Sequence, residues 1–141
     1  MEYRRGEYGI DTDKARLDVG LVHRYLSEES YWAAGRTRAE VETTIEHSLC
    51  FGVYHGKDGQ VGYARLVHDG LTVAYLADVF VLEGHRGRGL GKWVVETVIA
   101  HPPVAHIRRW MLFTQTAQEL YGRYGYAALE DPSVFMLRST V

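Results

Sequence analysis

A short stretch near the middle of the chain alternates glycine with arginine in a way that suits anion binding. Residues 86–91 read Arg-Gly-Arg-Gly-Leu-Gly. Glycine has no Cβ, so the backbone can turn tightly and leave N–H groups open to a ligand. Arginine supplies forked, permanently charged donors that match the geometry of a phosphate. The stretch therefore predicts a pyrophosphate site, with a solvated, glycine-capped loop as the structural alternative, because an isolated Gly-x-Gly pair is common.

The flanking residues predict a strand before this turn and a helix after it. Residues 75–82 are dense in β-branched and aromatic residues, as in a buried strand. A helix begins near Gly89 and carries apolar residues at helical spacing until His101-Pro102-Pro103 ends it. Free N–H groups at the start of such a helix attract anions. A dinucleotide fingerprint and a P-loop fit less well, because the glycines are spaced one by one and no Lys-Ser or Lys-Thr pair follows.

The rest of the chain predicts an α+β domain with a mixed sheet. Asp11-Thr12-Asp13 supplies residues typical of a helix start, and Thr37 with Glu40 forms a capping box. Short turns make the middle strands an antiparallel meander, whereas a helix crossover makes the next strand parallel. In chain order we expect a strand at 3–11, helices at 17–25 and from 37, strands at 49–55, 61–68 and 72–82, a helix at 89–100, a strand at 109–114, a helix at 117–124 closed by Gly125, and strands at 126–129 and 134–138.

The composition limits the classes of function. We expect residues 1–141 to form one domain, which is long enough to bury a core. The chain has 16 Lys and Arg against 18 Asp and Glu, a net charge of −2, which argues against binding nucleic acid or an anionic membrane surface. It has no apolar leader and no apolar run near the roughly 18 residues that span a bilayer. We therefore expect a cytoplasmic protein.

Cysteine and histidine give no sign of a metal site. Cys50, the single cysteine, lies in the apolar run 49–54, which indicates a buried structural thiol and fits a reducing compartment. The seven histidines show no spacing typical of ligands. We expect no bound metal.

Two segments carry a resemblance to a known family. Arg86-x-x-Gly89-x-Gly91, directly after the strand residues Asp78–Val81, resembles the acyl-CoA-binding signature of the GNAT acetyltransferase superfamily. Ala117-x-x-Leu120-Tyr121 followed by Gly125-Tyr126 resembles that family's closing signature. The resemblance implies the GNAT acyl-CoA N-acyltransferase fold, α/β/α layered around a mixed sheet, with the order β-α-α-β-β-β-α-β-α-β-β. It also implies acetyl-CoA as cosubstrate and direct attack of an amine on the thioester in a ternary complex.

The resemblance assigns the cosubstrate contacts residue by residue. It implies a phosphate cradle formed by Arg86, Gly87, Arg88, Gly89, Leu90, Gly91 and Lys92. Main-chain groups of Val79, Phe80 and Val81 would bind the pantetheine amides and the oxyanion, if this strand separates from the next one. Thr114 stands where many relatives have a cosubstrate-binding asparagine, which weakens one contact.

The catalytic residues are implied less directly. The resemblance makes Tyr121 the acid that protonates the leaving thiolate, with packing on the core as its alternative role. Several amine-acetylating relatives have Leu-Glu-Asp where this chain has Leu76-Ala77-Asp78, so Asp78 is the strand's only carboxylate. Strand alternation places residues 77 and 78 on opposite faces, so Asp78 inherits the role of base only if the backbone bulges. Its alternative is a polar clamp on the Tyr31-Trp32 loop or on a turn, and Glu28, Glu29 or a water chain could then carry the proton.

For the acceptor, the resemblance implies a site under the first two helices. The candidate contacts are Tyr31, Trp32, Arg36 and Phe51. Arg36 favours an acceptor with a carboxylate, whereas Glu28 and Glu29 favour a polyamine. We predict an N-acetyltransferase acting on the primary amine of a small molecule. The alternatives are a protein or peptide N-acetyltransferase and a non-catalytic acyl-CoA-binding regulatory domain, and a homodimer is common in that family.

Overall fold

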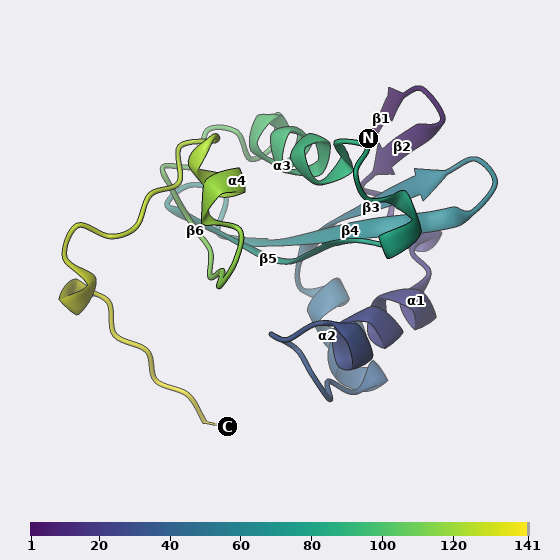
Figure 1. Ribbon diagram of the computed structural model, residues 1–141. Helices are drawn as coiled ribbons and strands as arrows, with labels where there is room; N and C mark the ends of the chain where they lie inside the picture. The colour runs from purple at the N-terminus through teal and green to yellow at the C-terminus, as the bar shows by residue number, and fades with distance from the viewer. Residues whose placement is uncertain (141) are drawn as a thin grey trace.

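The computed structural model describes residues 1–140 and shows a mixed sheet covered by helices on both faces (Figure 1). The sheet has six strands in the order β1-β2-β3-β4-β5-β6, antiparallel throughout except that β6 runs parallel to β5. The strands are β1 (Glu2–Arg5), β2 (Tyr8–Asp11), β3 (Leu49–His55), β4 (Gly59–His68), β5 (Val73–Val81) and β6 (Arg109–Met111). The α+β class and the layered mixed sheet are confirmed.

The helices form one layer on each side of the sheet (Figure 1). On one face lie α3 (Leu90–Ala100) and α4 (Gln118–Gly122), and on the other lie α1 (Val19–Arg24), its π-helical continuation η2 (Tyr25–Glu29) and α2 (Arg38–Glu46). Short 3₁₀ turns occur at η1 (Lys14–Arg16), η3 (Glu83–His85) and η4 (Pro132–Val134). None of the helices formed by residues 1–140 combines the length and apolar character that a bilayer crossing needs.

Local signals predicted several elements well. α2 begins with the expected capping box, in which Thr37 accepts from the Glu40 N–H and the Glu40 carboxylate accepts from the Thr37 N–H. α3 starts after Gly89, which adopts a left-handed φ of 76°, and it ends at Ala100. Its apolar face is buried against the sheet, where the larger of two core clusters is centred. The antiparallel meander and the parallel strand after α3 are confirmed.

The beginning of the chain differs from the prediction. The expected single strand at residues 3–11 is a hairpin, because the chain turns at Gly6 with a φ of 58° and pairs Arg5 with Tyr8. Asp13 caps only the turn η1, and α1 begins after Asp18, whose carboxylate accepts from the Leu21 N–H at 3.0 Å. The helix start therefore lies several residues later than Asp11-Thr12-Asp13.

The two strands expected at 126–129 and 134–138 are wrong. Residues 126–140 form no strand, and Figure 1 shows this segment leaving the body of the fold. The apolar runs at 126–129 and 134–137 favour strands, but a strand also needs a hydrogen-bonding neighbour. Asp131 instead accepts from the Ser133 N–H and starts the turn η4. The observed order is β-β-α-α-β-β-β-α-β-α.

The middle of β5 carries the irregularity on which the site depends. Tyr63 pairs with Phe80 and Arg65 with Ala77, so two residues of β5 lie opposite Ala64. Asp78 lies in this bulge with a φ of 54°, a left-handed conformation that aspartate tolerates better than most residues. Pairing with β6 stops at Tyr75, so the two strands separate from Leu76 onward. β5 therefore bulges at Asp78, and its main chain from Leu76 onward has no strand partner on the β6 side.

Close packing of β4 against β5 yields a stability prediction. A Cβ at Gly62 would lie 2.9 Å from the Phe80 carbonyl oxygen and 3.1 Å from Val53 Cβ. Gly62→Ala should therefore lower the free energy of unfolding by about 1–3 kcal/mol, measured by urea denaturation. Gly56→Ala is the matched control, because a Cβ there meets no atom within 4 Å, and it should change stability by less than about 0.5 kcal/mol. Equal midpoints for the two variants would contradict the close approach.

Candidate functional site

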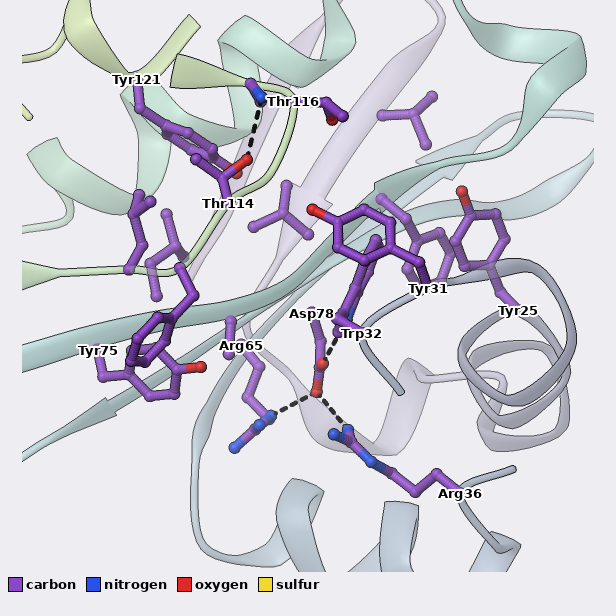
Figure 2. Close-up of a pocket in the computed structure, with 18 of the residues that line it drawn as sticks. Tyr25, Tyr31, Trp32, Arg36, Arg65, Tyr75, Asp78, Thr114, Thr116 and Tyr121 are labelled. Atoms are coloured by element: carbon purple, nitrogen blue, oxygen red, sulfur yellow. Dashed lines mark hydrogen bonds and ion pairs between the residues drawn. The ribbon is translucent and has the colours of Figure 1, made fainter. Parts of the chain in front are cut away.

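A cleft of about 510 Å³ opens where β5 and β6 separate. This volume is typical of a small-molecule site, which usually measures roughly 300–1,000 Å³. Its walls come from the loop after η2, from β5, and from the segment between β6 and α4 (Figure 2). The lining residues are Tyr25, Tyr31, Trp32, Arg36, Arg65, Tyr75, Leu76, Ala77, Asp78, Val79, Phe80, Val81, Arg86, Leu112, Phe113, Thr114, Thr116, Ala117 and Tyr121.

The Asp78 carboxylate is the most tightly held group in the cleft. Its side chain is only 1% exposed. Oδ1 accepts from Trp32 Nε1 at 2.9 Å, and Oδ2 accepts from Arg36 Nη1 at 2.9 Å and from Arg65 Nε at 2.8 Å (Figure 2). Both oxygens are therefore occupied by donors. This geometry matches the alternative of a clamp on the Tyr31-Trp32 loop better than that of a proton acceptor.

Arg65 is a cleft residue that the sequence reasoning missed. It lies on β4, its side chain is 11% exposed, and Nη1 donates to Ser48 Oγ at 3.2 Å. A single arginine inside the otherwise apolar run 61–67 was the available signal, because charged side chains are rarely buried without a partner. Its partner, Asp78, could be recognised only once the register of β4 and β5 was known.

Tyr31 joins the two walls of the cleft. Its hydroxyl accepts from the Gln115 N–H at 3.0 Å, so the loop after η2 is tied to the loop before α4. The Tyr31 and Trp32 rings meet edge to face with their centroids 5.1 Å apart. Both side chains are partly exposed, and both line the cleft as expected.

Tyr121 lies on α4 at the other end of the cleft from the Asp78 cluster (Figure 2). Burial, with a smaller contribution from Tyr31, raises the pKa of the Tyr121 hydroxyl above its ordinary value. The hydroxyl therefore keeps its proton at neutral pH. Nearby, Thr114 Oγ1 accepts from the Ala117 N–H at 3.0 Å, so its side chain fixes the loop just before α4 while also lining the cleft.

The glycine turn leads from the end of β5 into α3. Gly87 and Gly89 adopt left-handed φ angles of 78° and 76°. A Cβ at Gly87, Gly89 or Gly91 would meet no protein atom within 4 Å, so this side of the turn is open. The N–H groups of residues 90–92 have no acceptor within the described part of the chain, and no side chain caps α3. The backbone of the turn thus presents free donors at a helix start.

The two arginines of the turn are anchored by hydrogen bonds. Arg86 Nε donates to the Val81 carbonyl at 2.9 Å and Nη2 to the Tyr25 hydroxyl at 2.8 Å. Arg88 Nη1 donates to the Tyr8 hydroxyl at 2.8 Å. Lys92 is exposed on the first turn of α3. The arginines hold the turn against β5, η2 and β2, with part of each guanidinium left for a ligand.

Three side chains that could coordinate a cation lie close together beside the glycine turn. Ligand atoms of His55, Asp58 and His85 lie within 4.8 Å of one another, although their sequence spacing had predicted no such group. His85 bonds Asp58 Oδ2 at 2.9 Å and the Tyr8 hydroxyl at 2.8 Å, and His55 Nδ1 accepts from the Asp58 N–H. These hydrogen bonds connect the β3–β4 hairpin to the Tyr8 hydroxyl that receives Arg88.

Three residues that were candidates for contacting the acceptor or carrying its proton lie outside the cleft. Phe51 was expected to contact an acceptor, and this is wrong: the side chain is fully buried under α3 and packs edge to face on His101. Strand alternation turns it to the face of the sheet away from α1 and α2. Glu28 and Glu29, the alternative proton acceptors, are exposed on η2 and do not line the cleft.

Comparison with known proteins gives consistent matches over most of the chain. The family described as "Acetyltransferase (GNAT) domain" matches residues 46–128. A Gibberella zeae protein, named provisionally as an acetyltransferase, is 32% identical over 142 residues, covering 87% of this chain and 80% of that protein. The crystal structure of a GNAT-family protein from Xanthomonas campestris pv. campestris is 43% identical, with a TM-score of 0.90 over 97% of this chain and 96% of that one.

A more distant structure shares the fold alone. A Mycobacterium tuberculosis protein crystallised in complex with CoA and NLQ is 15% identical, with a TM-score of 0.70 over 86% of this chain and 72% of that one.

Removing the charge of Asp78 tests the clamp. Asp78→Asn keeps the size and the tolerance of a left-handed φ, but it leaves Arg36 and Arg65 without a negative partner. We expect the free energy of unfolding to fall by roughly 3 kcal/mol in chemical denaturation.

Glu42→Gln serves as the control, since Glu42 pairs with Arg38 on the exposed face of α2 at 2.9 Å. Its effect should be below about 0.5 kcal/mol. A similar small loss in Asp78→Asn would show that the cluster contributes little to stability.

Proposed function

Since the chain belongs to the GNAT acetyltransferase family, we propose that it transfers the acetyl group of acetyl-CoA to the primary amine of a small molecule. The observation that supports this most is the separation of β5 from β6 beyond Tyr75. It opens unpaired main chain beside a tyrosine that keeps its proton at neutral pH. A thioester bound there would have main-chain donors for its oxyanion and an acid for its sulfur.

The glycine turn is the proposed site for the diphosphate of acetyl-CoA. The free N–H groups of residues 90–92, the open Cβ positions and the anchored Arg86 and Arg88 make a suitable donor set for an anion of this size. Lys92 adds a charge at the rim. The pantetheine arm would follow the open edge of residues 79–81 into the cleft. The M. tuberculosis protein of the same fold was crystallised with CoA, which supports acetyl-CoA as the cosubstrate in this proposal.

In the proposed reaction, the amine nitrogen attacks the thioester carbonyl carbon, the C–N bond forms and the C–S bond breaks. The amine gives up one proton and the sulfur gains one. Tyr121 is the proposed donor to the sulfur. Asp78 is the only carboxylate among the residues that line the cleft, and three donors already occupy it. We therefore assign it to positioning, and the amine's proton to water.

A direct assay tests this function. The purified protein is incubated with acetyl-CoA and a panel of amines, amino acids and peptides, and free CoA thiol and acetylated product are measured. Amine-dependent release of CoA with a small molecule supports the proposal. Turnover with peptides alone favours a peptide N-acetyltransferase, and binding of acetyl-CoA without any turnover favours a non-catalytic acyl-CoA-binding domain.

The cradle can be tested at Gly91, where φ is not left-handed and a Cβ meets no protein atom. Gly91→Ala should leave stability unchanged or slightly higher, because alanine favours helix. The added methyl would crowd the bound diphosphate, and we expect the Kd for CoA to rise about 10-fold, measured by calorimetry. An unchanged Kd for CoA would show that the phosphates do not bind at this turn.

The role of Tyr121 as the acid can be tested by removing its hydroxyl oxygen. Tyr121→Phe should lower kcat about 100-fold while the KM for acetyl-CoA stays within about twofold. The raised pKa of Tyr121 also predicts that wild-type kcat has no alkaline decline below about pH 10. Tyr124→Phe is the control, because the Tyr124 hydroxyl donates to Glu96 outside the cleft. Equal activity of the two variants would leave Tyr121 with a packing role.

A further inference from the structure

We propose that the acceptor carries a carboxylate as well as its amine, and that Arg36 and Arg65 bind this carboxylate. The inference rests on the proposed acetyl transfer and names the class of acceptor: an amino carboxylate with an apolar or aromatic body. Four observations of the cleft carry it, namely its charge balance, its free donors, the way the two arginines are fixed, and its aromatic walls.

The charge balance of the cleft is positive. The charged side chains that line it are Arg36, Arg65 and Arg86 against the single carboxylate of Asp78. Arg86 is directed to the Val81 carbonyl and the Tyr25 hydroxyl, so the Asp78 cluster itself holds two positive charges and one negative charge. An anionic group would complete this cluster. A polyamine would add charge of the same sign, and Glu28 and Glu29 do not reach the cleft to offset it.

The two arginines also have donors to spare. Arg36 uses Nη1 for Asp78, and Arg65 uses Nε for Asp78 and Nη1 for Ser48. The other N–H groups, on Arg36 Nε and Nη2 and on Arg65 Nη2, bond no atom of residues 1–140. Both side chains are partly open, at 23% and 11% exposure. A guanidinium with a free edge is well suited to a carboxylate, which accepts two parallel hydrogen bonds.

Asp78 fixes the two guanidinium groups before a ligand arrives. Both donate to the same oxygen, Oδ2, so they are held next to each other at the edge of the cleft (Figure 2). Little side-chain entropy would then be lost when a carboxylate binds. Burying a carboxylate between two arginines costs desolvation free energy, so a buried cluster of this kind is weak evidence for stability alone. Binding of a ligand carboxylate would explain why the cluster is there.

The walls between the arginines and Tyr121 are aromatic. Tyr31 and Trp32 lie on one side and Tyr75 on the other (Figure 2). Phe113, which also lines the cleft, packs edge to face on Tyr75 with the ring centroids 5.8 Å apart. These rings suit an apolar or aromatic body. An acceptor placed with its carboxylate at the arginines would direct its amine toward the open edge of β5.

Two acceptors that differ only in the carboxylate test the proposal. Phenylalanine and phenethylamine are compared as acceptors with wild type, Arg36→Gln and Arg36→Lys, with thermal unfolding recorded for each protein. We expect the wild-type kcat/KM to be at least about 10-fold higher for phenylalanine. In Arg36→Gln this ratio should approach one through a higher acceptor KM, while the KM for acetyl-CoA stays within about twofold. Arg36→Lys keeps a charge for Asp78 but loses the fork, so it should retain stability and lose most of the preference.

Arg38→Gln is the control, because Arg38 pairs with the exposed Glu42 on α2, and it should behave as wild type. A wild-type enzyme that uses phenethylamine as well as phenylalanine overturns the carboxylate site and leaves acetyl transfer intact. A rise in the KM for acetyl-CoA in Arg36→Gln, at an unchanged acceptor KM, also overturns it, because the arginines would then serve the cosubstrate phosphates. Absence of turnover with every amine, despite binding of CoA, overturns the proposed function itself.

Discussion

The buried carboxylate of Asp78 is the interaction on which the cleft depends. It joins three parts of the fold that are distant in sequence: the bulged strand β5, Arg65 on β4, and the loop carrying Trp32 and Arg36. A carboxylate with a 1% exposed side chain must be paired, so these contacts are obligatory rather than optional. They hold the loop over the sheet, and the hydrogen bond from Gln115 to Tyr31 then closes the loop against the opposite wall.

The same residue shapes the backbone. A left-handed φ of 54° at a non-glycine residue is a strained conformation, which typically costs about 1–3 kcal/mol and persists where the surroundings enforce it. Here the three donors enforce it. The bulge moves Asp78 out of strict alternation, so Ala77 and Asp78 are both buried. The separation of β6 beyond Tyr75 then leaves the neighbouring main chain without a strand partner on that side. The strained φ of Asp78, the three hydrogen bonds to its carboxylate and the unpaired edge of β5 are therefore parts of one local arrangement.

What the sequence predicted correctly depends on neighbours within about one turn. The capping box at Thr37 and the glycine turn with α3 follow from residues three or four positions apart. What the sequence predicted wrongly, missed or left open concerns longer distances. The face of Phe51, the partner of Arg65 and the bulge at Asp78 all depend on how β3, β4 and β5 pair, which no local pattern contains. The segment after residue 126 has apolar runs that favour a strand, but within residues 1–140 no neighbouring strand pairs with it.

The positive cleft also bears on how the acceptor amine loses its proton. An ammonium group is disfavoured where like charges surround it, because nearby positive charge stabilises the neutral form. The cleft presents three guanidinium groups and one carboxylate, and that carboxylate is bound to two of the three. In the proposed complex the acceptor's own carboxylate balances the second charge of the Arg36 and Arg65 pair, so the pair no longer disfavours an ammonium group. The amine's proton then goes to water, since Asp78, the only carboxylate that lines the cleft, is already bound by three donors. In the proposed arrangement the alanine at position 77 leaves β5 without a second carboxylate, and Asp78 fixes the arginines that recognise the acceptor instead of acting as a base.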